Sequence, residues 1–261
     1  MVKLDKAHCA AAFELYRSTE SFFPLIAAVL LDKQDGVVYA DDSVAPRQVY
    51  VEHAFGFAQI FGIPCAGFEA DLERYLLIDR RFSVPKARLY TPYLPPFLNT
   101  AKWDSLRSFR QRFFIDPDGP FRDQLAASGQ AGKIEPVSVD EINVAEIERA
   151  FGVIGRFWRN PGDFIHKANA VVALYHGRPA SICYSAAEAD RRVEIDVLTV
   201  PEYRTLGVGK FAVMHFVKRC FEQSLQPLWD CFSNNAASMH LCRSVGFYAP
   251  RPPYPFFTIN R

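Results

Sequence analysis

The sequence has no pair of cysteines with C-x-x-C spacing, although six cysteines are spread along its 261 residues. This absence argues against a structural zinc site, because the common zinc motifs carry such pairs. Most of the cysteines lie in apolar runs, where a thiol usually acts as a small buried hydrophobic group. The pattern is typical of a reducing compartment and not of a disulfide-stapled secreted domain.

The sequence also lacks an excess of charge of either sign, and it lacks long apolar runs. The formal net charge is only +1, so no basic field is expected for nucleic acid or an anionic membrane. The longest apolar run, residues 22–31, is far shorter than the roughly 20 residues that a spanning helix needs. The N-terminus does not resemble a signal peptide. We therefore expect a cytoplasmic protein with neither a nucleic acid nor a membrane as partner.

A change of composition near residues 117–135 divides the chain. Residues 116–120 are rich in turn formers, and residues 126–133 are small and polar with two glycines. We predict an N-terminal α/β domain at residues 1–130 and a second domain at residues 131–261. The fold class expected for the whole chain is α+β, with mixed sheets.

The first half reads as a mixture of strands and one helix. The helix is expected at residues 68–77, where apolar residues have helical spacing. A mixed apolar segment at residues 49–60 is interpreted as a strand with an irregularity. Further strands are predicted at residues 24–31, 37–40, 87–90 and 109–115. No catalytic motif occurs in this half.

The second half has a regular order of elements. Helices are predicted at residues 139–159, 207–223 and 235–244, the last closed by Gly246. Strands are predicted at residues 169–175, 179–186, 193–200, 227–232 and 256–259. The order is therefore helix, three meandering strands, helix, strand, helix and strand.

A glycine-containing loop connects the third of these strands to the following helix. Two glycines in this loop let the backbone approach a ligand closely. Its amides converge at a helix N-terminus, which attracts anions and suits a pyrophosphate. The loop lacks the patterns of triphosphate-binding and dinucleotide-binding sites. By itself it also fits a tight turn without a ligand. The loop residues are Arg204, Thr205, Leu206, Gly207, Val208, Gly209 and Lys210.

The sequence around the loop resembles the GNAT superfamily of N-acetyltransferases. Residues 193–210 resemble its motif A, Arg/Gln-x-x-Gly-x-Gly/Ala, and residues 235–247 resemble its motif B. Within motif B, Ser238 replaces the usual Ala and Cys242 replaces the usual Tyr. The segments around Glu194–Thr199 and Pro227–Cys231 are similar to a bacterial subgroup of zwittermicin-resistance-type acetyltransferases. The resemblance covers residues 140–261 and implies a GNAT fold there.

The resemblance also implies acetyl-CoA as the cofactor. In GNAT proteins the strand before the loop splays from its parallel neighbour, and the pantetheine arm binds along the exposed strand edge. The matching positions are Val197 and Thr199, with Leu198 between them. Asn235 matches a residue that commonly contacts pantetheine, and it also fits as a helix cap.

Two carboxylates precede these positions on the same strand. Glu194 and Asp196 are two residues apart, so an ideal strand places them on one face. Their mutual repulsion in a partly desolvated cleft would raise at least one pKa, which suits a general base. We favour Asp196 as the base and then Glu194. The alternative is a solvent-facing pair that only orients substrate charge.

The general acid is not specified by the motif. Cys242 is one candidate, and a small core residue is its alternative. Tyr248 is a second candidate. The coenzyme A thiolate could also leave unprotonated or take a proton from water. Asp230 and His240 are expected near the cleft without an assigned role.

The first half is interpreted as a degenerate GNAT-like copy without the phosphate loop. It would cover the catalytic sheet and form a wall of the acceptor pocket. Candidate lining residues, each of which also fits as core, are Tyr90, Tyr93, Phe97 and Trp103.

The sequence thus predicts an acyltransferase that moves an acetyl group from acetyl-CoA to a primary amine of a small molecule. A binding or sensor protein that holds acyl-CoA without turnover is the first alternative, and an acyltransferase with a different acyl donor is the second. A homodimer is left open as the assembly.

Overall fold

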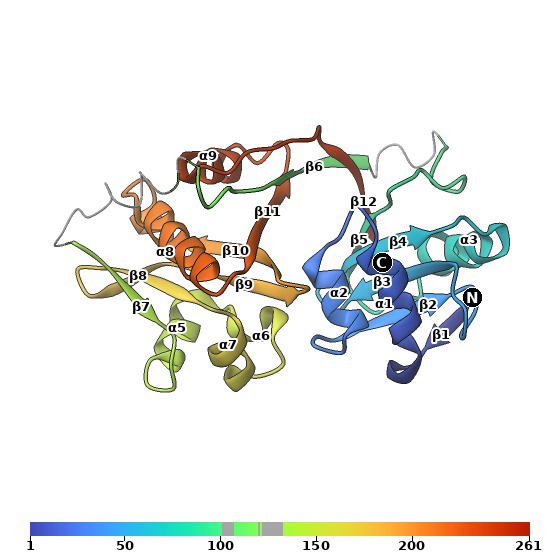
Figure 1. Ribbon diagram of the computed structural model, residues 1–261, viewed down its shortest axis with the longest axis horizontal. Helices are drawn as coiled ribbons and strands as arrows, with labels where there is room; N and C mark the ends of the chain where they lie inside the picture. The colour runs from blue at the N-terminus through green and yellow to red at the C-terminus, as the bar shows by residue number, and fades with distance from the viewer. Residues whose placement is uncertain (101–106, 120, 122–132) are drawn as a thin grey trace. The chain divides into compact units, whose positions relative to one another are not determined.

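The computed structural model describes residues 1–100, 107–119, 121 and 133–261. These residues form two compact units, which we describe one at a time (Figure 1). The first unit comprises Met1–Arg110 together with Tyr254–Arg261, and the second comprises Gln111–Pro253. The predicted boundary at residue 130 lies outside the described residues. The observed division also places the C-terminal strand in the first unit and not in the second.

The first unit contains a sheet with the strand order β1-β2-β3-β4-β5-β12. Neighbouring strands are antiparallel except β4 and β5, which are parallel. β12 also pairs with the start of β6 (Arg107–Phe113), a strand that runs through the division between the units. The other strands are β1 (Val2–Leu4), β2 (Gly36–Ala40), β3 (Gln48–His53), β4 (Phe57–Gly62), β5 (Lys86–Tyr90) and β12 (Tyr254–Asn260).

The predicted irregular strand at residues 49–60 is a hairpin. β3 and β4 form its two arms, and Gly56 provides the left-handed turn residue with φ +85°. The predicted strands at residues 37–40, 87–90 and 109–115 are confirmed as β2, β5 and β6.

The helices of the first unit are α1 (Cys9–Arg17), α2 (Pro24–Leu30) and α3 (Ala66–Glu73), and α3 continues into a π-helical turn, Arg74–Ile78. The prediction of a strand at residues 24–31 was wrong. A short run of apolar residues has no periodicity that distinguishes a strand from a buried helix. Pro24 at the first helical position favours the helix, and all seven residues of α2 are buried.

The second unit repeats this arrangement of strands. Its sheet has the order β7-β8-β9-β10-β11-β6, and β10 and β11 are its parallel pair. The pairs β7–β8, β8–β9 and β9–β10 are antiparallel. The strands are β7 (Ile134–Ser138), β8 (Val171–Tyr175), β9 (Arg178–Ala189), β10 (Arg192–Thr199) and β11 (Gln226–Phe232). β7 was not predicted; the other four were.

Helices cover both faces of this sheet. α8 (Val208–Glu222) crosses one face, and α5 (Val144–Phe151), α6 (Ile154–Phe157) and α7 (Pro161–Lys167) lie on the other (Figure 1). A single helix at residues 139–159 was expected. Gly152, with φ +62°, instead ends α5 before α6 begins. α9 (Ala236–Val245) is capped by Asn235 and closed by Gly246, which has φ +111°.

The two units therefore share one topology: an edge strand, helices, three antiparallel strands, a helix and a parallel strand. Each unit has its own buried core. Tyr90 and Phe97 are buried, Tyr93 packs against the core of the first unit, and Trp103 lies outside the described residues. Among the described helices, none is long and apolar enough to cross a membrane.

Candidate active site

The parallel strands β10 and β11 separate after a short contact. Only Arg192–Glu194 pairs with Gln226–Leu228, while β10 continues to Thr199. The register of β10 against β9 shifts between Glu194 and Ile195, at the point of separation. Residues 195–200 are half-buried. The separation therefore exposes one edge of β10 beyond Glu194, where backbone groups lack a strand partner in the described part of the chain.

The hydrogen bonds of β10 indicate which backbone groups face this open edge. The Val200 N–H donates to Ala180 O at 3.0 Å, so the backbone groups of Val200 point toward β9. Because successive residues of a strand direct these groups to opposite sides, Val197 and Thr199 direct theirs toward the open edge. Val197 N–H meets the adjacent Asp196 carboxylate there, at 3.1 Å from Oδ1.

The loop after β10 presents amides at the start of α8. Thr205 and Gly207 have left-handed backbones, with φ +65° and +81°. The first hydrogen bond of the helix is from Phe211 N–H to Gly207 O, at 3.0 Å. The amides of residues 208–210 precede that bond, as at any helix start, and the helix dipole adds partial positive charge. Arg204 is exposed and Lys210 is half-buried. The loop can therefore hold a phosphate group.

Close packing ties the loop to the end of β10. Ser181 and Thr199 share a hydrogen bond of 2.9 Å between their hydroxyl oxygens. A Cβ atom added at Gly209 would lie 3.0 Å from Thr199 Oγ1. A larger residue at this position would press on the Thr199 side chain, so glycine favours the close approach of α8 to β10.

Gly209→Ala should lower the free energy of unfolding by about 1 kcal/mol, because an overpacking cost of about 1–3 kcal/mol exceeds the gain of at most about 1 kcal/mol from replacing a glycine in a helix. Urea denaturation would measure the change. In the Thr199→Ala background the same substitution should cost less, because the opposing hydroxyl is gone. Equal costs in both backgrounds would show that this contact is not the cause.

Asp196 is held by three donors in the second unit. Its Oδ2 lies 2.6 Å from the Tyr184 hydroxyl and 2.9 Å from Arg156 Nη1, and its Oδ1 accepts the Val197 amide. Burial and the Asp196 charge raise the pKa of Tyr184 well above its usual value, so Tyr184 stays a hydrogen-bond donor. The sequence analysis missed both partners, because they are far from Asp196 in the chain and belong to no motif.

Glu194 and the remaining candidates have different surroundings. Glu194 is only 5% exposed and stands at the last β10–β11 pair. Cys242 is fully buried in the core, donates to Met239 O at 3.3 Å, and has a pKa raised to about 12 by burial. Tyr248 is 53% exposed, and its backbone pairs with Phe114. The surroundings of Cys242 fit a core residue better than a proton donor.

Asn235 caps α9, because its side chain accepts the Ser238 N–H at 3.1 Å. Asp230 is paired with Arg112 at 3.4 Å, and its side chain is almost fully buried. His240 is exposed on α9. The capping role of Asn235 is thus confirmed, and its predicted contact with pantetheine stays a prediction.

The first unit fills the corresponding places with its own side chains. At the start of α3, Gln48 Oε1 accepts the Cys65 N–H at 2.7 Å, and the buried Glu69 carboxylate accepts from Gln48 and Tyr93. A carboxylate in this first turn would repel a phosphate.

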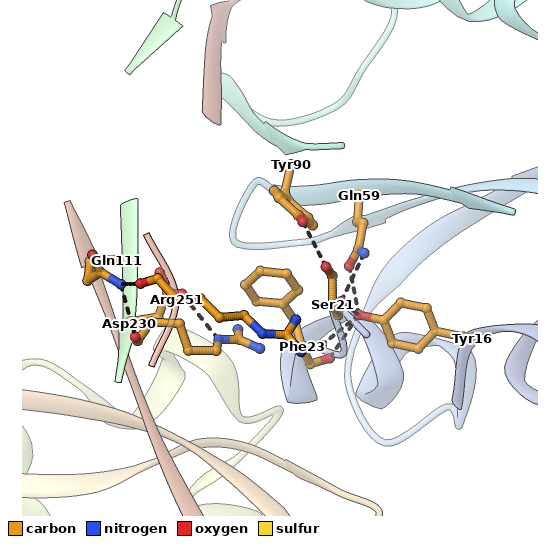
Figure 2. A network of polar contacts seen from close by, with 9 residues as sticks. Tyr16, Ser21, Phe23, Gln59, Tyr90, Gln111, Asp230 and Arg251 are labelled. Carbon is orange, nitrogen blue, oxygen red and sulfur yellow. Dashed lines mark hydrogen bonds and ion pairs between the residues drawn. The ribbon is translucent and has the colours of Figure 1, made fainter. Parts of the chain in front are cut away.

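Part of the polar network drawn in Figure 2 ties α1 to the parallel strands β4 and β5 of the same unit. The Tyr16 hydroxyl donates to Gln59 at 2.7 Å, Gln59 donates to Ser21 O at 3.0 Å, and Ser21 and Tyr90 share a hydrogen bond of 2.7 Å. No phosphate loop precedes α3 in the sequence.

We therefore expect one acetyl-CoA per chain, bound by the second unit. Isothermal titration calorimetry should give a stoichiometry close to one. A stoichiometry close to two would contradict this account of the first unit.

The sequence model of the GNAT acetyltransferase family matches residues 19–257. This chain belongs to the GNAT acetyltransferase family. The match extends beyond the second unit into most of the first, in agreement with the repeated topology. The predictions of a GNAT superfamily member and of an α+β GNAT fold are confirmed.

Similar proteins include other GNAT members. An uncharacterized N-acetyltransferase of Bacillus subtilis (strain 168), YdfB, is 25% identical over 241 residues, which is 87% of this chain and 88% of that protein. A GCN5-related N-acetyltransferase-like protein from Streptococcus suis superposes with a TM-score of 0.65 at 17% identity, over 98% of this chain and 99% of that one.

A tandem GNAT protein from the clavulanic acid biosynthesis pathway also superposes with a TM-score of 0.65, at 9% identity, over 98% of this chain and 95% of that one. At this identity the likeness concerns the fold alone. Two successive units of GNAT topology are thus a feature that this GNAT chain shares with a solved structure.

Proposed function

We propose that this GNAT protein transfers an acetyl group from acetyl-CoA to a primary amine of a small molecule. The observation that carries the proposal is the position of the open β10 edge directly before the amides at the start of α8. One extended ligand with a polar arm and a pyrophosphate matches both features. The family supports acetyl transfer, and the amine acceptor is our inference from the site.

In this proposal the pyrophosphate lies on the amides of residues 207–210, and Arg204 and Lys210 add positive charge. The pantetheine arm forms hydrogen bonds with the backbone of Val197 and Thr199. The glycine at position 209 lets these two parts of the site lie close together.

We assign the general base to Asp196. Its Oδ1 accepts the same Val197 amide that is proposed to bind pantetheine. When the arm takes over that amide, Oδ1 is left to accept a proton from the acceptor ammonium, while Tyr184 holds Oδ2. Bound acetyl-CoA supplies the activated acyl carbon and a thiolate leaving group. Glu194 is the alternative base, and its near-complete burial makes it less accessible to an acceptor.

A protein that binds acyl-CoA without turnover is the second candidate. The observation that favours it is the ion pair of Asp196 with Arg156, together with the buried position of Cys242 where the family pattern has a tyrosine. An enzyme that uses a different acyl-CoA fits the same loop.

Two measurements separate these functions. Titration with acetyl-CoA tests the binding site, and release of free thiol over a panel of primary amines tests turnover. Binding followed by amine-dependent release supports the proposal. Binding without release across the panel supports the non-catalytic protein, and faster release from a longer acyl-CoA supports the other donor. No binding of any acyl-CoA would contradict all three functions.

A further inference from the structure

An ion pair lies beside the open edge of β10 and is accessible to solvent. Arg156, on α6, and Asp196, on β10, are 2.9 Å apart, and their side chains are 35% and 25% exposed. Their separation in the chain is 40 residues. The pair therefore results from the placement of α6 over this face of the sheet and not from a local turn.

The neighbouring side chains hold this pair in a defined position. Tyr184 donates to Asp196 at 2.6 Å, and its ring contacts the rings of Phe157 and Phe164. The Arg156 guanidinium lies 5.6 Å from the centre of the Phe157 ring. One charge of each sign is thus presented beside a cluster of aromatic rings.

A solvent-accessible pair of this kind contributes little to stability, because water already screens both charges. It does, however, offer a complementary surface to a ligand that carries both charges close together. An ammonium group can approach the Asp196 carboxylate while a carboxylate approaches the partly exposed Arg156 side chain. Planar guanidinium groups bind carboxylates with two parallel hydrogen bonds.

We propose that the acceptor is a zwitterionic amine, with a carboxylate next to the amino group as in an α-amino acid, and that Arg156 selects it by binding that carboxylate. This inference rests on the proposed function. Asp196 faces the amino group that is to be acetylated, and Arg156 orients the acceptor by binding the neighbouring carboxylate. Amines without the carboxylate lack this contact with Arg156.

The test compares acceptors that differ only in the carboxylate. Thiol release from acetyl-CoA is followed with a set of α-amino acids, with their carboxamides and with the corresponding decarboxylated amines. We expect kcat/KM to be about 10- to 100-fold higher for the amino acid than for its carboxamide, the range for one charge-assisted hydrogen-bonded pair. The difference should lie mainly in KM, because the carboxylate is bound in both the ground state and the transition state.

Substitutions locate the source of that preference. Arg156→Gln should lower the ratio of the two kcat/KM values to about one, and Arg156→Lys should keep part of it because the charge remains. Arg149→Gln, an exposed residue on α5, is the matched control and should keep the full ratio. Thermal melting of each variant verifies that it is folded.

The outcomes distinguish this inference from the proposed function. Turnover of amines with no preference for the carboxylate, or a preference that survives in Arg156→Gln, would overturn the inference and leave the acetyltransferase intact. Absence of thiol release with every amine would overturn both.

Discussion

Gly207→Glu should weaken the binding of acetyl-CoA by at least about 100-fold. Gly207 caps α8 with φ +81°, and its position is exposed. A glutamate there would compete for the amides at the helix start and repel the pyrophosphate; at about 4 Å such a repulsion reaches roughly 4 kcal/mol near a protein surface. Isothermal titration calorimetry would measure the loss.

Two controls separate charge from backbone strain in that experiment. Gly207→Ala introduces the same left-handed backbone strain as Gly207→Glu, which costs about 1–2 kcal/mol. It adds no charge, and its β-carbon meets no atom within 4 Å. Gly177→Glu places the same side chain on an exposed glycine with φ +75° in the turn between β8 and β9. We expect both controls to bind far better than Gly207→Glu. Comparable losses in the controls would mean that the loop does not hold the phosphates.

Asp196→Asn should lower kcat by about 100-fold or more, the usual range for loss of a general base. The dissociation constant of acetyl-CoA should change little, because the carboxylate is not expected to contact the cofactor's charged groups. Asparagine keeps the shape of the side chain, so Tyr184 and Arg156 keep an oxygen to donate to. Single-turnover kinetics at saturating acetyl-CoA would isolate the chemical step.

Glu194→Gln is the informative comparison for the identity of the base. A larger loss of kcat in Glu194→Gln than in Asp196→Asn would transfer the role of base to Glu194. Asp118→Asn, in an exposed turn, serves as the control for removal of one carboxylate. Wild-type turnover by Asp196→Asn would remove this residue from the chemistry.

Much of the second unit was predictable, because its signals are local. Strand patterns, the glycines of the loop and the Asn235 cap each act within a few residues of the chain. The largest error in the first unit, the strand predicted at residues 24–31, arose where the chain is apolar on every side. Burial on every side erases the periodicity on which such a prediction depends.

The chemistry of the candidate site was less predictable. Two carboxylates on β10 indicated a general base. Which of them is accessible depends on where the pairing with β11 ends and on the position of α6, and neither can be predicted from the sequence. From the sequence, Cys242 could be either the general acid or a small core residue. Its complete burial in the core fits the core residue better, and this burial also raises the pKa of its thiol to about 12.

The sequence by itself determined the family, the position of the glycine-containing loop proposed to bind phosphate, and the strand that precedes it. These features follow from backbone conformations that particular residues impose on their neighbours. Only the tertiary structure decided that the last strand belongs to the first unit, that the first unit fills its own helix start, and that Arg156 faces Asp196. Each of these depends on contacts between residues far apart in the chain, and no local pattern records such contacts.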